Sequence, residues 1–159
     1  MKKLVFVLVA VAALCACQKS SAPVDFNYRG LAFTLPVSQF VDSMVARGFA
    51  VDSAASDSGN NVVLASPAEH YRVLAAFKGD QLMVIQETYN LSTNDSTRQM
   101  WQEIRDGLEK ELGAWPDCPV LKDDHKQANF DAGEGLISVL LENTYTPTLT
   151  VRYTKKNAK

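Results

Sequence analysis

The stretch YRVLAAFKGDQLMVIQETY, residues 71–89, decides the fold class. Gly79 and Asp80 are a two-residue hairpin signal between two runs rich in β-branched and aromatic residues. Alternate positions of the first run hold Tyr, Val, Ala and Phe, which share one face of a strand. We therefore predict two antiparallel strands, Tyr71–Lys78 and Gln81–Tyr89, in a sheet covered by helices on at least one side.

Further short strands are expected on both sides of this hairpin. Each is a short apolar or alternating run next to turn-forming residues. These strands are Phe26–Tyr28, Phe49–Val51, Val62–Ser66, Leu136–Glu142 and Leu149–Tyr153.

Two helices interrupt the strands. The first is predicted after a Thr34 cap, with Pro36 in its first turn and Gly48 as its left-handed end. Its apolar face consists of Val37, Phe40, Val41, Met44 and Val45. The second begins with a capping box at Ser96 and ends at Gly113. Its apolar face consists of Trp101, Ile104, Leu108 and Leu112.

Composition places these elements in one globular domain. The chain has 159 residues, 47% hydrophobic and 21% charged. We predict the α+β class, with a mostly antiparallel sheet of about six or seven strands and two helices packed on one face. The domain is expected over residues 25–153, with a basic tail over 154–159, and no internal repeat of fixed period is visible.

The N-terminus has the pattern of a secretory signal. Lys2 and Lys3 precede residues 4–16, which carry no charge and are shorter than the roughly 20 residues a membrane-spanning helix needs. Residues 1–16 are therefore predicted to be a signal peptide that is removed. Its loss takes away two lysines, so the formal net charge changes from −2 to −4. An acidic secreted body argues against binding to nucleic acid.

The end of this signal resembles a bacterial lipobox. Leu14-Cys15-Ala16-Cys17 has an aliphatic residue, two small residues and then a cysteine. Cys15 fits poorly as the modified residue, because Leu14 would then stand where a small residue is expected. The resemblance implies acylation of Cys17 and anchorage to a membrane, with residues 17–24 as a lipidated tether.

The residues after Cys17 favour one membrane face. Gln18 is not the aspartate associated with retention in the inner membrane. Lys19-Ser20-Ser21 lacks the acidic run associated with surface export in Bacteroidota lipoproteins. We expect the protein in the outer membrane, facing the periplasm.

The most reactive-looking stretch is Cys118–His125, which also holds Asp123 and Asp124. A thiol and an imidazole can form a nucleophilic pair or contribute to a metal site, but two ligands are fewer than zinc requires. We interpret the stretch up to Gly135 as an irregular loop, and Cys118 as a lone thiol once Cys17 is acylated.

Other acidic groups carry weaker signals. The loop Asp57–Asn61 is only superficially like a calcium loop, since its oxygen ligands and terminal glutamate are out of register. The carboxylate pairs Glu109/Glu111 and Asp123/Asp124 are ordinary for a solvated helix face and a loop. The sequence predicts no catalytic residues, no cofactor and no metal site.

The chain as a whole resembles the small cell-envelope lipoproteins common in Bacteroidota. The features that carry the resemblance are the lipobox, Tyr28-Arg29-Gly30-Leu31 before a capped helix that closes at Arg47-Gly48-Phe49, and the helix Trp101–Gly113. Ala32 departs from the proline expected in that opening. More distantly, the plan is similar to small outer-membrane assembly lipoproteins and inhibitor-like modules, which bind proteins.

Two functional hypotheses follow. The first is a non-enzymatic, lipid-anchored module that presents a sheet face or the long loop to another envelope protein. The alternative is a small-molecule binding protein or hydrolase that uses the 117–135 loop.

Overall fold

The computed structural model describes residues 26–57, 60–66, 71–143 and 147–156. The predicted signal peptide, Cys17 and the tether lie outside these residues.

The described chain forms a mostly antiparallel sheet with two helices, as the α+β prediction requires. The main sheet has eight strands in the order β3-β4-β5-β6-β10-β9-β8-β7, and β1 and β2 form a separate two-stranded sheet. The strands are β1 Asn27–Tyr28, β2 Leu31–Ala32, β3 Ala50–Val51, β4 Asn61–Ser66, β5 Tyr71–Lys78, β6 Gln81–Tyr89, β7 Asp117–Leu121, β8 His125–Asp131, β9 Gly135–Asn143 and β10 Pro147–Lys155. The hairpin that decides the fold class is confirmed, with both strands at their predicted bounds.

The predicted strand count of six or seven was too low. The strands that were not predicted are β2, β7 and β8. In the segment that forms β7 and β8, prolines and charged residues hide any apolar alternation, so its sequence predicts a loop. It forms strands because β8 pairs along its length with the strongly apolar β9, which supplies the missing backbone hydrogen bonds.

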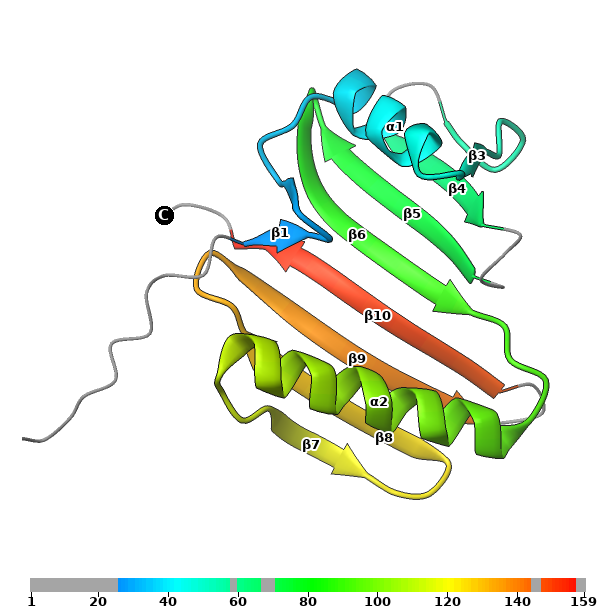
Figure 1. Cartoon of the computed structure of the whole chain (residues 1–159), viewed down its shortest axis with the longest axis vertical. Helices are drawn as coiled ribbons and strands as arrows, with labels where there is room; N and C mark the ends of the chain where they lie inside the picture. Colours follow the sequence, from blue (N-terminus) through cyan, green and yellow to red (C-terminus); the bar gives the residue numbers. More distant parts are fainter. Residues whose placement is uncertain (1–25, 58–59, 67–70, 144–146, 157–159) are drawn as a thin grey trace, which may run out of the picture.

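The two halves of the main sheet have the same connectivity. Each half is a helix followed by four antiparallel strands in sequence order, and the halves meet where β6 pairs with β10. The order of the strands is therefore symmetric about this seam. The helices α1 (Val37–Ala46) and α2 (Asn94–Leu112) lie on the same side of the sheet, one over each half (Figure 1).

The hydrophobic core lies between the helices and the sheet. Phe40 and Met44 of α1 and Trp101 and Leu108 of α2 are buried against it. Val45, predicted in the core, is 49% exposed because it lies one position past Met44 and points away from the sheet.

The helix ends confirm the predicted glycines and correct both predicted caps. Gly113 is the left-handed end of α2, and Gly48 follows α1 with φ +90°. The N-cap of α2 is Thr93, whose Oγ1 accepts a hydrogen bond from the Ser96 N–H at 3.1 Å. The first turn therefore starts before the predicted capping box.

The first turn of α1 is capped from another element, not by Thr34. The helix begins after Pro36, and the Val37 N–H donates to Oδ1 of Asp80 at 3.0 Å. Asp80 lies in the β5–β6 turn, so this cap exists only after the hairpin has docked against α1.

The β1–β2 hairpin lies over the seam between the two halves (Figure 1). Its turn residues Arg29 and Gly30 have φ of +50° and +79°, the pattern of a tight two-residue hairpin. Tyr28 is fully buried, and its ring packs edge-on against Tyr153 of β10 at 5.3 Å between centroids.

Candidate functional site

One broad face of the main sheet is left uncovered by α1 and α2. Strand alternation directs every second side chain away from the helices, and antiparallel register aligns these side chains across neighbouring strands. We call the central residues of this surface the open face: Val63, Leu74, Ala76, Val84, Gln86, Thr88, Gln127, Asn129, Leu136, Ser138, Leu140, Thr150, Arg152 and Thr154.

The open face is almost without charge. Its residues are aliphatic, hydroxyl or amide side chains, and most are half-buried against their neighbours. Arg152 on β10 is the exception: it is exposed beside the β6–β10 seam, between Gln86 and Ser138. Within the described ranges, no hydrogen bond or ion pair involves its side chain. Depletion of charge around an arginine is the composition of a protein interface centre.

The whole uncovered surface of the sheet, with the open face at its centre and charged residues such as Arg72, Asp131 and Glu142 toward its edges, approaches the size of a stable interface. Eight strands spaced by about 4.8 Å, most with six to nine residues, give a footprint on the order of 700–800 Å². A standard protein–protein interface buries about 800 Å² on each partner. At the edge of this surface Arg72 faces Asp52 at 4.0 Å, a long and exposed ion pair.

On the opposite face, the centre of the sheet holds a buried carboxylate, Glu87 of β6. It is 2% exposed, and both of its oxygens accept hydrogen bonds. Oε1 accepts from Tyr28 Oη at 2.7 Å and Arg29 Nε at 3.0 Å, and Oε2 accepts from Tyr89 Oη at 2.9 Å. Nη2 of Arg29 lies 2.9 Å from Oε1.

The electrostatics of this cluster keep the phenols neutral. Burial raises the pKa of Tyr28 above its ordinary value, and the negative charge of Glu87 raises it further. The same two causes raise the pKa of Tyr89 and of Tyr153. Burial is the largest single effect on Arg29 and disfavours its charged form, but the Glu87 carboxylate and the neighbouring tyrosines together outweigh burial, so the pKa of Arg29 is raised.

The Glu87 cluster ties the β1–β2 hairpin to the sheet. The cluster was not predicted from the sequence, although a signal was present: Glu87 occupies an inward-facing position of a strand, between Ile85 and Tyr89. A carboxylate in such a register needs partners, because a buried charge without them is strongly destabilising. Tyr89 is a local partner, whereas Tyr28 and Arg29 come from the β1–β2 hairpin, 59 and 58 residues earlier in the chain.

The hollows that the described residues line on the surface include a small one and a wider one. The first, about 110 Å³, has Leu108 and Ile137 in its walls and Arg29, Glu111 and Tyr153 among its polar lining. It is smaller than the roughly 300 Å³ at which pockets for small molecules begin. The second is a wider hollow of about 790 Å³ at one end of the sheet. It is lined by Thr34, Lys78, Gln81, Met83, Glu134, Lys155 and Lys156.

The structure does not bring Cys118 and His125 together. The predicted loop is the β7–β8 hairpin, in which Cys118 lies between the pairs Asp117–Asn129 and Val120–Gln127. His125 lies two to four residues farther along β8, roughly 7–13 Å away at strand spacing. Cys118 is half-buried and packs against the core.

The acidic groups singled out from the sequence have local partners or lie apart. The Asp57 carboxylate accepts hydrogen bonds from the side chain of Asn61 and from the backbone of Asn61 and Asn60, which lower its pKa. Asp123 and Asp124 are exposed in the β7–β8 turn. In the part of the chain that the structure describes, no three His, Cys, Asp or Glu side chains form a group able to hold a metal ion.

No described helix is long and apolar enough to cross a bilayer. The chain matches no family model, no curated protein and no solved structure. The open face is therefore assigned as the candidate site on its geometry and composition alone.

Proposed function

We propose that this chain is a lipid-anchored protein of the bacterial cell envelope that binds another envelope protein through the open face. Acylated Cys17 would hold it in the outer membrane, facing the periplasm. The single observation that carries the proposal is the open face, the centre of an uncovered sheet surface about as large as a standard interface, which holds Arg152 as its one charged side chain.

Binding fits the chemistry of the described residues better than catalysis does. The open face offers hydroxyls, amides and aliphatic side chains, which provide contact area and hydrogen bonds. Cys118 and His125, the groups with most potential for reaction, are separated by strand register. The Glu87 oxygens are already used by three side chains of the fold.

Arg152 defines the chemistry of the partner. An exposed guanidinium within an uncharged surface gains most from a carboxylate that meets it as water is excluded. The partner is therefore a folded protein with a broad, weakly charged surface that carries an aspartate or glutamate near its centre.

The test is recovery of partners from detergent-solubilised native membranes with wild type, Arg152→Glu and Lys110→Glu. Lys110 is an exposed cation on α2, so Lys110→Glu changes charge equally but on the other side of the molecule. Losing a central arginine at an interface corresponds to an affinity decrease of about 30-fold or more. We expect Arg152→Glu to lose a protein that wild type and Lys110→Glu both recover.

The anchor is tested separately with Cys17→Ser. This variant should be released from membranes and carry no fatty acid, while its purified domain still binds the recovered partner. Equal recovery of all proteins by wild type and Arg152→Glu would contradict the docking surface. Unchanged membrane retention of Cys17→Ser would contradict the anchor.

A further inference from the structure

One end of the main sheet gathers several strand ends and turns. The start of β9 pairs with the end of β10, Gly135 opposite Lys155, and the start of β6 lies beside the end of β10. The β8–β9 turn and the start of β7 are at the same end. We call this the Phe26 end, because the described chain begins there: the Phe26 ring lies against Gly135 and packs at a tilt against Phe33, with 4.4 Å between the ring centroids.

The distance from the expected anchor to this end is limited by covalent geometry. Nine backbone steps separate Cys17 from Phe26, and at about 3.3–3.6 Å each they span at most roughly 30 Å in any conformation. If Cys17 is acylated, the Phe26 end is the part of the domain held nearest the lipid, at a high effective concentration.

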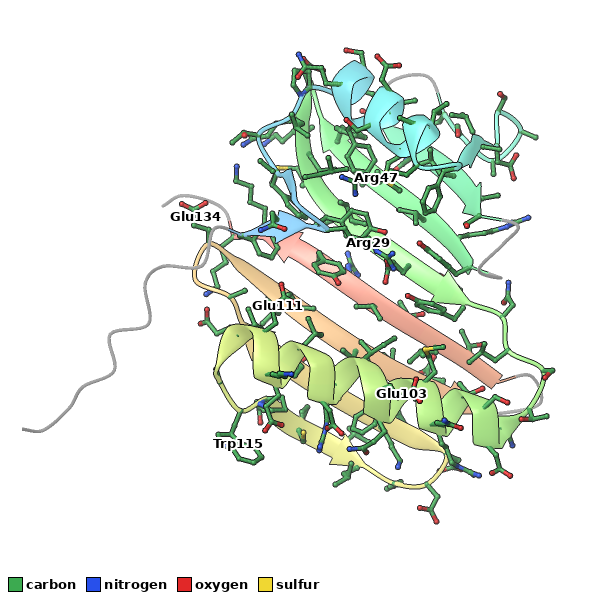
Figure 2. The ribbon with its side chains drawn as sticks, viewed as in Figure 1. Arg29, Arg47, Glu103, Glu111, Trp115 and Glu134 are labelled. Carbon is green, nitrogen blue, oxygen red and sulfur yellow. The ribbon has the colours of Figure 1, made fainter. Side chains whose placement is uncertain are left out.

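Trp115 is exposed at this same end. It follows Gly113, the left-handed end of α2, and precedes β7. Its side chain is 83% exposed and points away from the body of the domain (Figure 2). Trp101, by contrast, is 1% exposed, and its indole N–H donates to the Val139 carbonyl at 3.2 Å. Exposed tryptophan is favoured at membrane–water interfaces, where its ring is partly apolar and its N–H remains hydrogen-bonded.

Charge at the Phe26 end is nearly balanced. Among the described residues, the cations here include Lys78, Lys110, Lys155 and Lys156, and the anions include Asp80, Glu111, Asp117, Asp131 and Glu134. Lys156 is paired with Asp131 at 2.7 Å. A surface of this kind is not attracted to anionic lipid, so contact with a membrane must come from the indole.

We propose that the Phe26 end rests on the lipid headgroup layer with the Trp115 indole inserted at the interface. This inference depends on the acylated Cys17 of the proposed function and deepens it. With the strand ends on the membrane, the strands run roughly parallel to the membrane normal, and the open face points parallel to the membrane plane. The protein partner is then the part of a membrane-bound protein within roughly 30 Å of the lipid, the length of a nine-residue strand.

The experiment uses the full-length acylated protein in vesicles of zwitterionic phospholipid, with and without brominated acyl chains. Tryptophan emission is recorded for wild type and for Trp115→Phe, which retains only Trp101 as a buried reference. We expect wild-type emission in vesicles to be shifted to the blue and to lose its Trp115 component when brominated lipid is present. Trp115→Phe should show neither change.

Two controls separate this inference from the anchor. Mass spectrometry and flotation with the vesicles establish whether the protein is acylated and bound. The inference would be overturned, and the anchor left intact, by a protein that is acylated and floats with the vesicles but keeps Trp115 in water. In that case the Trp115 emission maximum stays at long wavelength, iodide quenches the emission, and brominated lipid does not. Quenching that requires anionic lipid would also overturn it, because contact would then depend on the lysines. A protein that is neither acylated nor bound would overturn both proposals.

Discussion

At the scale of single residues, Glu87 is the centre of a buried hydrogen-bond cluster. It is the one acidic side chain among the described residues that is buried, and it joins β6 to Tyr28 and Arg29 of the β1–β2 hairpin, with a further hydrogen bond from Tyr89 of its own strand. Hydrogen bonds to a buried charge are stronger than neutral ones, and breaking them leaves Arg29 without its counter-charge.

Glu87→Gln tests this role. Glutamine keeps the size of the side chain but removes the charge, so we expect a decrease of about 2–3 kcal/mol in the free energy of unfolding; this allows for the partial exposure of Arg29. Glu142→Gln, on an exposed part of β9, should stay within about 0.5 kcal/mol of wild type. Urea unfolding of both variants measures the difference, and equal stabilities would show that the cluster is dispensable.

The buried phenols predict loss of stability in alkali. The pKa values of Tyr28, Tyr89 and Tyr153 are raised in the folded protein, so the unfolded chain releases phenolic protons first as the pH passes about 10. A tyrosine that is protonated in the folded state and ionised in the unfolded state favours unfolding more as the pH rises. Each such tyrosine decreases the free energy of unfolding by about 1.4 kcal/mol for every pH unit above 10. Stability from these groups is therefore complete below pH 10 and declines above it.

Phenolate absorbance recorded together with near-ultraviolet circular dichroism checks this. These three tyrosines should ionise only as tertiary structure is lost. Ionisation of most tyrosines near pH 10 in a protein that keeps its circular dichroism would contradict the prediction.

At the scale of elements, the β1–β2 hairpin is held by shape as well as by charge. Gly135 at the start of β9 has its Cα against the Phe26 ring, and a Cβ placed there would overlap that ring. Gly135 does not have a positive φ, so glycine is needed here because it leaves room for the Phe26 ring and not because of its backbone conformation.

Gly135→Ala should therefore displace Phe26 and decrease the free energy of unfolding by about 1–3 kcal/mol, the usual cost of overpacking. Phe26→Ala removes the ring that a Cβ at Gly135 would overlap. In the Phe26→Ala background, Gly135→Ala should therefore decrease the free energy of unfolding much less than it does in wild type. A double-mutant cycle measures this coupling. Additive effects would mean that the two residues do not touch in solution.

Elements set by local sequence patterns were predicted at their observed bounds, whereas elements set by distant residues were not. The strands β5 and β6 were predicted at their bounds because a period-two pattern and a Gly-Asp turn are both local signals. The cap of α1 was not, because its acceptor Asp80 lies 43 residues away from Val37. The hairpin of β7 and β8 was missed for the same reason, since β9 holds it in place.

At the scale of the whole molecule, the core and the proposed binding surface lie on opposite faces of one sheet. The core lies on the helix side, whereas the open face lies on the other and is proposed to remain available to a partner. Arg152→Glu should therefore change the free energy of unfolding by no more than about 0.5 kcal/mol while abolishing partner recovery. Thermal unfolding of the variant used in the recovery experiment tests this separation. A large loss of stability would mean that reduced binding reflects unfolding.

The amino-acid sequence alone determined the α+β class, most strands and both helices, because hydrophobic period and turn chemistry act over a few residues. The lipid anchor at Cys17 likewise remains a prediction from a local pattern. Tertiary structure decided the matching connectivity of the two halves, the Glu87 cluster across the seam, the separation of Cys118 from His125, and the open face. Each of these depends on pairing between segments far apart in the chain, which strand register sets and local sequence does not encode.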